Sequence, residues 1–169
     1  MSSLSAGAGS DLAADVALCG ADEELLACLR EVYARLEADI DSADLECRAC
    51  GHCCLFDRAD HTLFVSTGEL ALLASQPVRP GCTPRPLRCA YQVDSRCTAR
   101  DRRPLGCRVF FCSQDRRPRY PETYETLHRA VRAAHQRRKL PYRYVELTAA
   151  LAELFRRGCI SVDSPRPNP

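Results

Sequence analysis

Hydrophobic residues recur every three or four positions in the segment that begins at residue 22. The repeat is formed by Leu25, Leu29, Val32, Leu36 and Ile40. This spacing places all of them on one face of an amphipathic helix, and it predicts that this face packs on a core. Asp22 stands at the position of an N-cap, and the glutamates after it suit the positive end of the helix dipole.

A shorter apolar pattern, "HTLFVSTGELALLAS", predicts a strand followed by a helix. The strand is expected around Leu63 to Val65, where β-branched and aromatic residues gather. Ser66 or Thr67 then suits the N-cap of a helix that ends near Ser75.

The next segment is broken by prolines and then returns to strand-forming residues. "QPVRPGCTPRPL" contains four prolines, which indicates a loop. "LRCAYQV" and "RCTAR" follow, separated only by Asp94 and Ser95. Two short apolar runs around such a dipeptide predict a hairpin that carries Cys89 and Cys97.

Two helices are predicted in the last third of the chain. Pro121 suits the first turn of a helix that ends before Pro141. A second helix is expected from about Tyr144 to a C-cap at Gly158.

These patterns predict an α+β, helix-rich fold with one domain over residues 21–158. A small irregular cysteine-rich metal-binding centre with a short hairpin is expected within residues 45–112, packed by N- and C-terminal helices, the latter within residues 121–158. Residues 1–20 and 159–169 are predicted to be disordered tails, because small, polar and proline residues predominate there.

Charge is divided unevenly along the chain, although the formal net charge is only +2. Residues 1–46 hold eleven acids and two arginines, whereas residues 96–143 hold fourteen Lys or Arg and four acids. Such asymmetry can mark a polyanion-binding face. We favour the simpler interpretation that the acidic segment packs over the basic one, or that both are solvated, because aromatic residues are not interleaved and no base-reading motif is present. A nucleic-acid partner is therefore not expected.

Cysteine is the most unusual feature of the composition. The chain has twelve, of which nine lie between Cys47 and Cys112. The first twenty residues lack the cationic start and apolar centre of a secretory signal. No stretch approaches the roughly 18 to 20 apolar residues of a membrane span. We therefore expect a cytoplasmic protein without membrane contact, in which thiols stay reduced and dense cysteines serve as metal ligands before they form disulfides.

The segment "CRACGHCC", called here the first cysteine box, holds the densest group of thiols. Cys47, Cys50 and Cys53 follow the spacing C-x2-C-x2-C, which lets a tight loop turn three thiolates to one side, as in ferredoxin-type loops. Gly51 supplies the backbone freedom for such a turn. Cys54 is expected to face elsewhere, because adjacent side chains of an extended chain point to opposite sides. It can then serve a second metal, bridge two metals, or remain a free thiol.

The remaining ligands are expected from the segment between Cys89 and Cys112. Cys89 and Cys97 flank the hairpin, and Arg103-Pro104 brings the chain back to Cys107. A [4Fe–4S] centre held by four thiolates carries negative charge, so Arg103 and Arg108 are suited to donate hydrogen bonds to its sulfurs. Surface pairing of these arginines with Asp101 or Asp115 is the alternative.

With these residues in view, the sequence resembles the YkgJ-type cysteine-cluster family, a zinc- or iron-chelating domain of the CxxCxxCC kind. The resemblance covers residues 45–112 and includes the "VSTGEL" segment and Tyr91. It rests on three groups of residues, which are Cys47, Cys50, Gly51, Cys53 and Cys54; Cys89 and Cys97; and Arg103, Pro104, Cys107, Arg108 and Phe110. The resemblance implies metal or iron–sulfur binding, and it brings no settled reaction with it.

The other cysteines and the histidines are weaker candidates. Cys112 is close enough in sequence to Cys107 to be a further ligand, and Cys82 is a poorer one. The default interpretation of Cys19, Cys28 and Cys159 is a structural or free thiol. His52 is interpreted as a spacer in the box, and His128 and His135 as surface residues of one helical face.

The predicted function is therefore a metal-binding cysteine-cluster protein. The expected cofactor is an iron–sulfur cluster, of the [4Fe–4S] kind, with a redox, sensing or accessory role beside a protein partner. The predicted metal ligands are Cys47, Cys50, Cys53, Cys54, Cys89, Cys97, Cys107 and Cys112. Two alternatives stay open at this point, a structural zinc module and a metal-dependent enzyme or enzyme subunit, because thiolates suit both iron and zinc.

Overall fold

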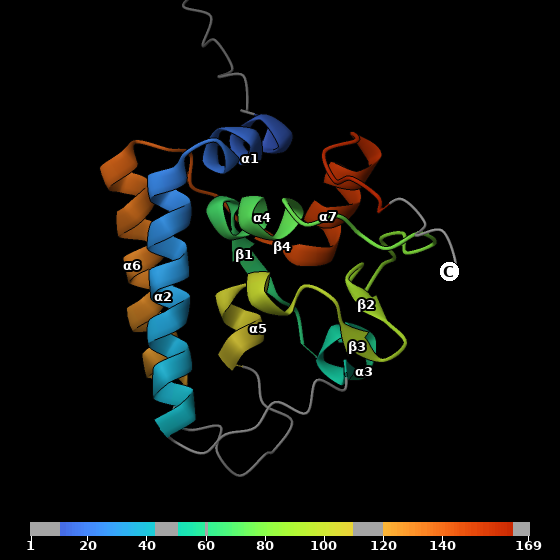
Figure 1. Ribbon diagram of the computed structural model, residues 1–169, viewed down its shortest axis with the longest axis horizontal. Helices are drawn as coiled ribbons and strands as arrows, with labels where there is room; N and C mark the ends of the chain where they lie inside the picture. Colours follow the sequence, from blue (N-terminus) through green and yellow to red (C-terminus); the bar gives the residue numbers. More distant parts are fainter. Residues whose placement is uncertain (1–10, 43–50, 60, 110–119, 164–169) are drawn as a thin grey trace, which may run out of the picture.

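The computed structural model describes residues 11–42, 51–59, 61–109 and 120–163 (Figure 1). It has the α+β, helix-rich character expected from the sequence, with two small antiparallel sheets. The elements are α1 (Leu12–Gly20), α2 (Glu23–Ser42), η1 (His52–Cys54), α3 (Phe56–Ala59), β1 (Phe64–Ser66), α4 (Thr67–Ala74), β2 (Gln92–Val93), β3 (Arg96–Cys97), η2 (Arg100–Arg102), α5 (Leu105–Val109), α6 (Tyr120–Arg138), β4 (Tyr144–Glu146) and α7 (Leu147–Arg156).

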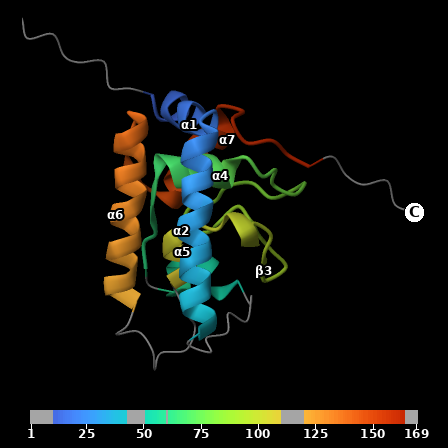
Figure 2. The ribbon, with the colours of Figure 1, turned by 60° about the vertical axis from the view of Figure 1, so that its left-hand side comes forward.

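Helix α2 forms as its hydrophobic pattern predicts. The backbone N–H of Leu25 donates to the Asp22 carboxylate over 2.8 Å, which confirms Asp22 as the cap. Leu25, Leu29 and Leu36 have no exposed surface, and the stripe they share faces the core. Helices α2 and α6 lie side by side (Figures 1 and 2). Together they form one wall of the domain.

Helix α4 occupies the centre of the domain, and every one of its residues is buried. The predicted cap is confirmed at Ser66, whose hydroxyl accepts from the N–H of Glu69 while the Glu69 carboxylate accepts from the N–H of Ser66. This reciprocal capping box fixes the start of α4 directly after β1.

The segment around Tyr144 differs from the expectation. The predicted helix from that residue is wrong in its first turn, because residues 144–146 form β4 and pair antiparallel with β1. Helix α7 begins only at Leu147, where the Glu146 carboxylate accepts from two backbone N–H groups. Pairing with β1 outweighs the local helical preference of residues 144–146. The sequence around Tyr144 could not predict this pairing, because the partner strand is distant in sequence. Gly158 has a φ of +72° just beyond α7, which confirms it as the residue that ends the helix.

Both predicted tails are wrong in part. Residues 12–20 form α1, which packs on α4 through Leu12, Val16 and Cys19. These three residues are spaced by four and three positions, as on one face of a helix. The small and acidic residues between them made this pattern hard to recognise in the sequence. At the other end, Ile160 is 4% exposed and Val162 bridges Val78. Residues 1–10 and 164–169 lie outside the described part.

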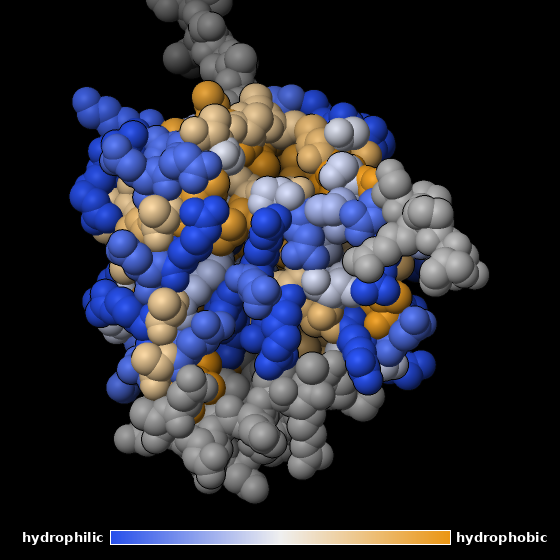
Figure 3. Space-filling model, viewed as in Figure 1, coloured by the Kyte–Doolittle hydropathy of each residue, from blue (hydrophilic) through white to orange (hydrophobic). Residues whose placement is uncertain are grey.

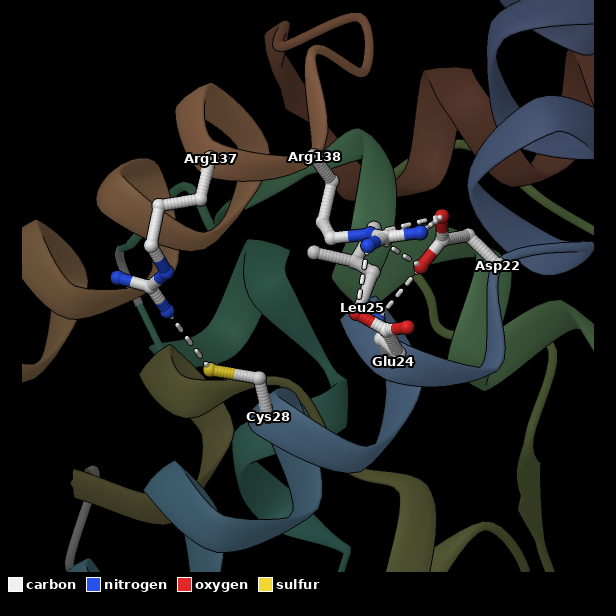
Figure 4. A network of polar contacts seen from close by, with 6 residues as sticks. All are labelled: Asp22, Glu24, Leu25, Cys28, Arg137 and Arg138. Atoms are coloured by element: carbon white, nitrogen blue, oxygen red, sulfur yellow. Dashed lines mark hydrogen bonds and ion pairs between the residues drawn. The ribbon is translucent and has the colours of Figure 1, made fainter.

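Opposite charges connect the two halves of the chain, as the simpler interpretation of the charge asymmetry predicts. Arg138 contacts Asp22 at 2.9 Å and Glu24 at 2.5 Å, so the end of α6 is joined to the start of α2 (Figure 4). Arg143 contacts the buried carboxylate of Asp15 at 2.7 Å. Hydrophilic side chains cover much of the face seen in Figure 3, over α2, α6 and the segment around β3.

The prediction that His135 is a surface residue is wrong, because its side chain has no exposed surface. Its Nδ1 bonds the carbonyl oxygen of Pro141 at 2.9 Å, and the Thr67 hydroxyl donates to the same oxygen at 2.7 Å. A Cβ added to Gly68 would lie 2.7 Å from Nε2 of His135. The histidine therefore fits into the core between α4 and α6 because position 68 has no side chain.

Within the described residues, no helix combines the length and the apolar character that crossing a bilayer requires.

Candidate metal centre

The first cysteine box and the hairpin segment are joined by backbone hydrogen bonds. The N–H of Cys89 donates to the carbonyl of Cys54 at 3.0 Å, and the N–H of Phe56 donates to Leu87 at 2.9 Å. These bonds form a short bridge between two segments that are more than thirty positions apart in sequence. They bring the backbones of Cys54 and Cys89 next to each other.

Gly51 presses the first box onto the turn of the hairpin. Its φ is +66°, and a Cβ at this position would lie 2.8 Å from the carbonyl carbon of Ser95. The side chain of Gln92 donates to the Gly51 carbonyl at 3.2 Å. Asp94 and Ser95 have φ values of 45° and 60°, as a tight hairpin turn requires. The predicted hairpin is thereby confirmed, and it holds the box in place.

A third segment brings Cys107 to the same place. Helix α5 follows Pro104, and the N–H of Leu105 donates to the buried carboxylate of Glu69 at 2.8 Å. This bond anchors α5 to the central helix α4. A Cβ on Gly106 would lie 2.4 Å from Cδ1 of Leu63, so α5 packs closely on the Leu63 side chain at this glycine.

The thiols of these segments affect one another's pKa. Interaction with Cys54 is the main cause of the lowered pKa of Cys53 and Cys97. The neighbouring thiols of Cys53, Cys89 and Cys97 raise the pKa of Cys54. Burial, and then the sulfurs of Cys89, Cys53 and Cys97, raise the pKa of Cys107. We call Cys53, Cys54, Cys89, Cys97 and Cys107 the cysteine centre.

The orientation of Cys54 corrects the expectation that it faces away from Cys53. Residues 52–54 form the 3-10 turn η1, closed by a bond from the N–H of Cys54 to the carbonyl of Gly51. In this turn adjacent side chains do not alternate as they do in a strand, so both thiols reach the same place.

The cysteine centre holds five of the eight predicted ligands, while Cys47, Cys50 and Cys112 lie outside the described residues. All nine described cysteines are free of disulfides. Across the described ranges, no three His, Cys, Asp or Glu side chains have the placement of a finished metal site. The thiols are thus close enough to influence one another's protonation without forming a closed coordination shell.

The two predicted arginines have different surroundings. The charge of Arg103 contributes to the lowered pKa of Cys53 and Cys97. The guanidinium of Arg108 forms an ion pair with Glu37 and donates to the carbonyls of Asp101 and Arg103 at 2.7 and 2.8 Å. Arg108 therefore joins α2 to α5 and holds the segment that carries Cys107.

Sequence reasoning missed the residues that support the centre from helices α2 and α4. Arg108 lies 4.2 Å above the ring centroid of Tyr33, which is 3% exposed. Burial, and then the charge of Glu69, raise the pKa of the Tyr33 hydroxyl. Tyr33 lies four positions after Leu29 on the apolar stripe, so the stripe could have identified it as buried. Its neighbours are distant in sequence and could not be read from the pattern.

The other described cysteines lie outside the cysteine centre. Cys19 is fully buried in the core, and burial raises the pKa of its thiol to about 11. Cys28 is half-buried and accepts from Arg137 at 3.6 Å (Figure 4). Cys159 is exposed, and Cys82 is half-buried in the proline-containing loop.

Comparison with protein-family models, curated proteins and solved structures finds no match to this chain.

Proposed function

We propose that this chain is a cysteine-cluster protein of the YkgJ type that binds an iron–sulfur cluster through its thiolates. The observation that carries the proposal is the cysteine centre itself. Five thiols from three separate segments lie close enough to shift one another's pKa, and none of them is in a disulfide. The ligands would be Cys53, Cys54, Cys89, Cys97 and Cys107, joined by Cys47, Cys50 and Cys112 of the same predicted set.

The chemistry of the donor set fits a thiophilic metal. Thiols packed together can all be deprotonated at once only if positive charge replaces their protons. Arg103 supplies part of that charge to Cys53 and Cys97. A bound metal would supply the rest, and its binding free energy would add to the free energy of folding.

An iron–sulfur cluster would give the protein one-electron redox chemistry. The chain's own residues would set its surroundings. Arg103 would stabilise the thiolates, and the Arg108–Glu37 pair would hold the segment that carries Cys107. We propose a redox, sensing or accessory role beside a protein partner in the cytoplasm.

A structural zinc site is the second candidate, and one observation favours it. The thiols of Cys53, Cys89 and Cys97 all affect the pKa of Cys54, so four sulfurs influence one another here. Four thiolates are the ligand set of many closed structural zinc sites. Zinc would give a colourless protein with no redox activity, so metal identity separates the two functions.

The test is purification without oxygen, followed by metal and sulfide analysis of the wild type and two serine variants. The proposal predicts a brown protein with broad absorption near about 400 nm and with iron and acid-labile sulfide. Cys53→Ser should lose most of both, whereas Cys28→Ser, a half-buried thiol outside the centre, should keep them. Zinc without sulfide would support the structural alternative, and full retention of iron in Cys53→Ser would contradict the proposed ligand set.

A further inference from the structure

A cavity of about 430 Å³ lies beside the cysteine centre. Its walls are α3, residues 61–62, the loop at 84–87 and the first turns of α7. The volume is within the range of about 300 to 1,000 Å³ that is usual for ligand pockets. The cavity is therefore large enough to receive one or two side chains of another molecule.

The lining of the cavity is largely apolar. The apolar lining residues are Phe56, Pro84, Pro86, Leu87, Ala149 and Ala152. Leu87 is 54% exposed, so an apolar side chain stands at the rim in contact with water. The lining also contains Arg85 and Glu146, and both carboxylate oxygens of Glu146 accept from backbone N–H groups in the first turn of α7, so Arg85 is the charged lining residue available to a ligand.

The cavity shares its backbone with the cysteine centre. Phe56 and Leu87, which line it, are joined by the hydrogen bond from the Phe56 N–H. Each lies two positions from a thiol of the centre, Cys54 or Cys89. A molecule seated in the cavity would thus press on the bridge that holds two of the proposed ligands.

The segment that supplies the loop at 84–87 to the cavity is positively charged. Residues 76–100 contain five arginines and one acid, Asp94, and all five arginines are exposed. Arg79, Arg85 and Arg96 form no ion pair with any acidic side chain in the described ranges. This differs from Arg138 and Arg143, whose charges are matched by the acidic helices of the same chain.

We propose that the cavity receives an apolar side chain from an acidic segment of a partner protein. An apolar anchor in a pocket with arginine around it is the usual composition of a protein–protein hot spot. Nucleic acid fits less well, because single strands bind through stacking on exposed aromatic faces, and Phe56 is only 5% exposed. The inference gives a chemistry to the partner in the proposed function, and it rests on that function for the existence of a partner.

The test uses fluorescence anisotropy with the full chain, purified with its metal, and short labelled peptides. The peptides have a central Leu, Met or Phe flanked by Glu and Asp, and matched peptides have a central Ala or flanking Lys. At least one acidic peptide with an apolar centre should bind, about tenfold more tightly than its Ala and Lys counterparts. Its affinity should fall as salt is raised.

Two variants place the binding at the cavity. Ala152→Phe puts a ring into the cavity from α7 and should weaken binding about tenfold, while Ala34→Phe puts the same ring on the exposed face of α2 and should not. Arg85→Glu should weaken binding to a similar extent, and Arg129→Glu on α6 should not. All four positions are exposed, so all four variants are expected to fold.

Three results would overturn the inference: no binding by any acidic peptide, equal binding of the Lys-flanked peptides, or tighter binding of a single-stranded oligonucleotide than of every peptide. Metal is measured in each sample. A protein without metal that still binds the acidic peptides through Arg85 would contradict the proposed function while it supports the cavity as a docking site.

Discussion

Replacement of Arg108 by methionine should destabilise the fold by about 2 to 3 kcal/mol and leave the proposed ligands in place. The guanidinium donates to two backbone carbonyls, and hydrogen bonds from a charged donor are worth about 1.5 kcal/mol or more each. Its position over Tyr33 adds about 1 kcal/mol. The Glu37 side chain is 55% exposed, so that ion pair adds less than about 1 kcal/mol. Burial of the methionine offsets part of the loss.

The assay is urea denaturation followed by circular dichroism, with metal content measured on the same samples. Glu37→Gln should lower the free energy of unfolding by less than about 1 kcal/mol, because Arg108 still donates to both backbone carbonyls in this variant. Arg35→Met, an exposed position on α2, should change the free energy of unfolding by less than about 0.5 kcal/mol. Equal stability of Arg108→Met and the wild type would refute the anchoring role. Loss of metal without loss of stability would instead support a role for Arg108 as a hydrogen-bond donor to the cofactor.

Two further predictions concern the core and the hairpin contact. Burial lowers the pKa of His135 below its ordinary value of 6.5, so below that pH the unfolded chain binds a proton that the folded chain does not. Stability should therefore be greatest above about pH 6.5 and fall with acidification, and His135→Gln should flatten this fall while His128→Gln should not. Gly51→Ala should destabilise more than Gly81→Ala, since both have positive φ but only Gly51 meets Ser95. Midpoints of chemical denaturation measure both differences.

The outcomes that contradict these two predictions are distinct. An unchanged pH profile in His135→Gln would mean that this ring does not carry the acid sensitivity. Equal losses for the two alanine variants would mean that backbone strain alone, and not contact with the hairpin, accounts for the effect at residue 51.

Elements with a local cause could be predicted from the sequence. The Asp22 cap, the Ser66 capping box and the Asp94-Ser95 turn each depend on residues within a few positions of one another. The stripe from Leu25 to Leu36 is likewise a local pattern. In these places the side chains that form the element also determine where it begins and ends.

Elements that depend on residues distant in sequence could not be predicted in this way. Strand β4 forms because Val145 pairs with Val65, which lies eighty positions earlier. No residue near Tyr144 indicates this partner. His135 is buried because Gly68 leaves space for it, and Ile160 is buried although the residues around it are polar. Long-range packing decides each of these cases.

The candidate site shows the same division. Box spacing, the predicted hairpin and the family resemblance together grouped Cys53, Cys89, Cys97 and Cys107, and in the structure these thiols affect one another's pKa. The direction of Cys54 depends on the 3-10 turn of η1, and the position of Arg108 depends on Glu37 of α2. Both follow from backbone geometry and tertiary contacts that a motif does not contain.

The measurement that tests the central claim most directly is the ratio of iron, sulfide and zinc to protein after purification without oxygen, in the wild type and in Cys53→Ser. The account predicts iron and acid-labile sulfide in the wild type and the loss of most of both in the variant, because Cys53 lies within the group of thiols around Cys54. A wild-type protein with no bound metal, or a variant with its full complement of iron and sulfide, would contradict it.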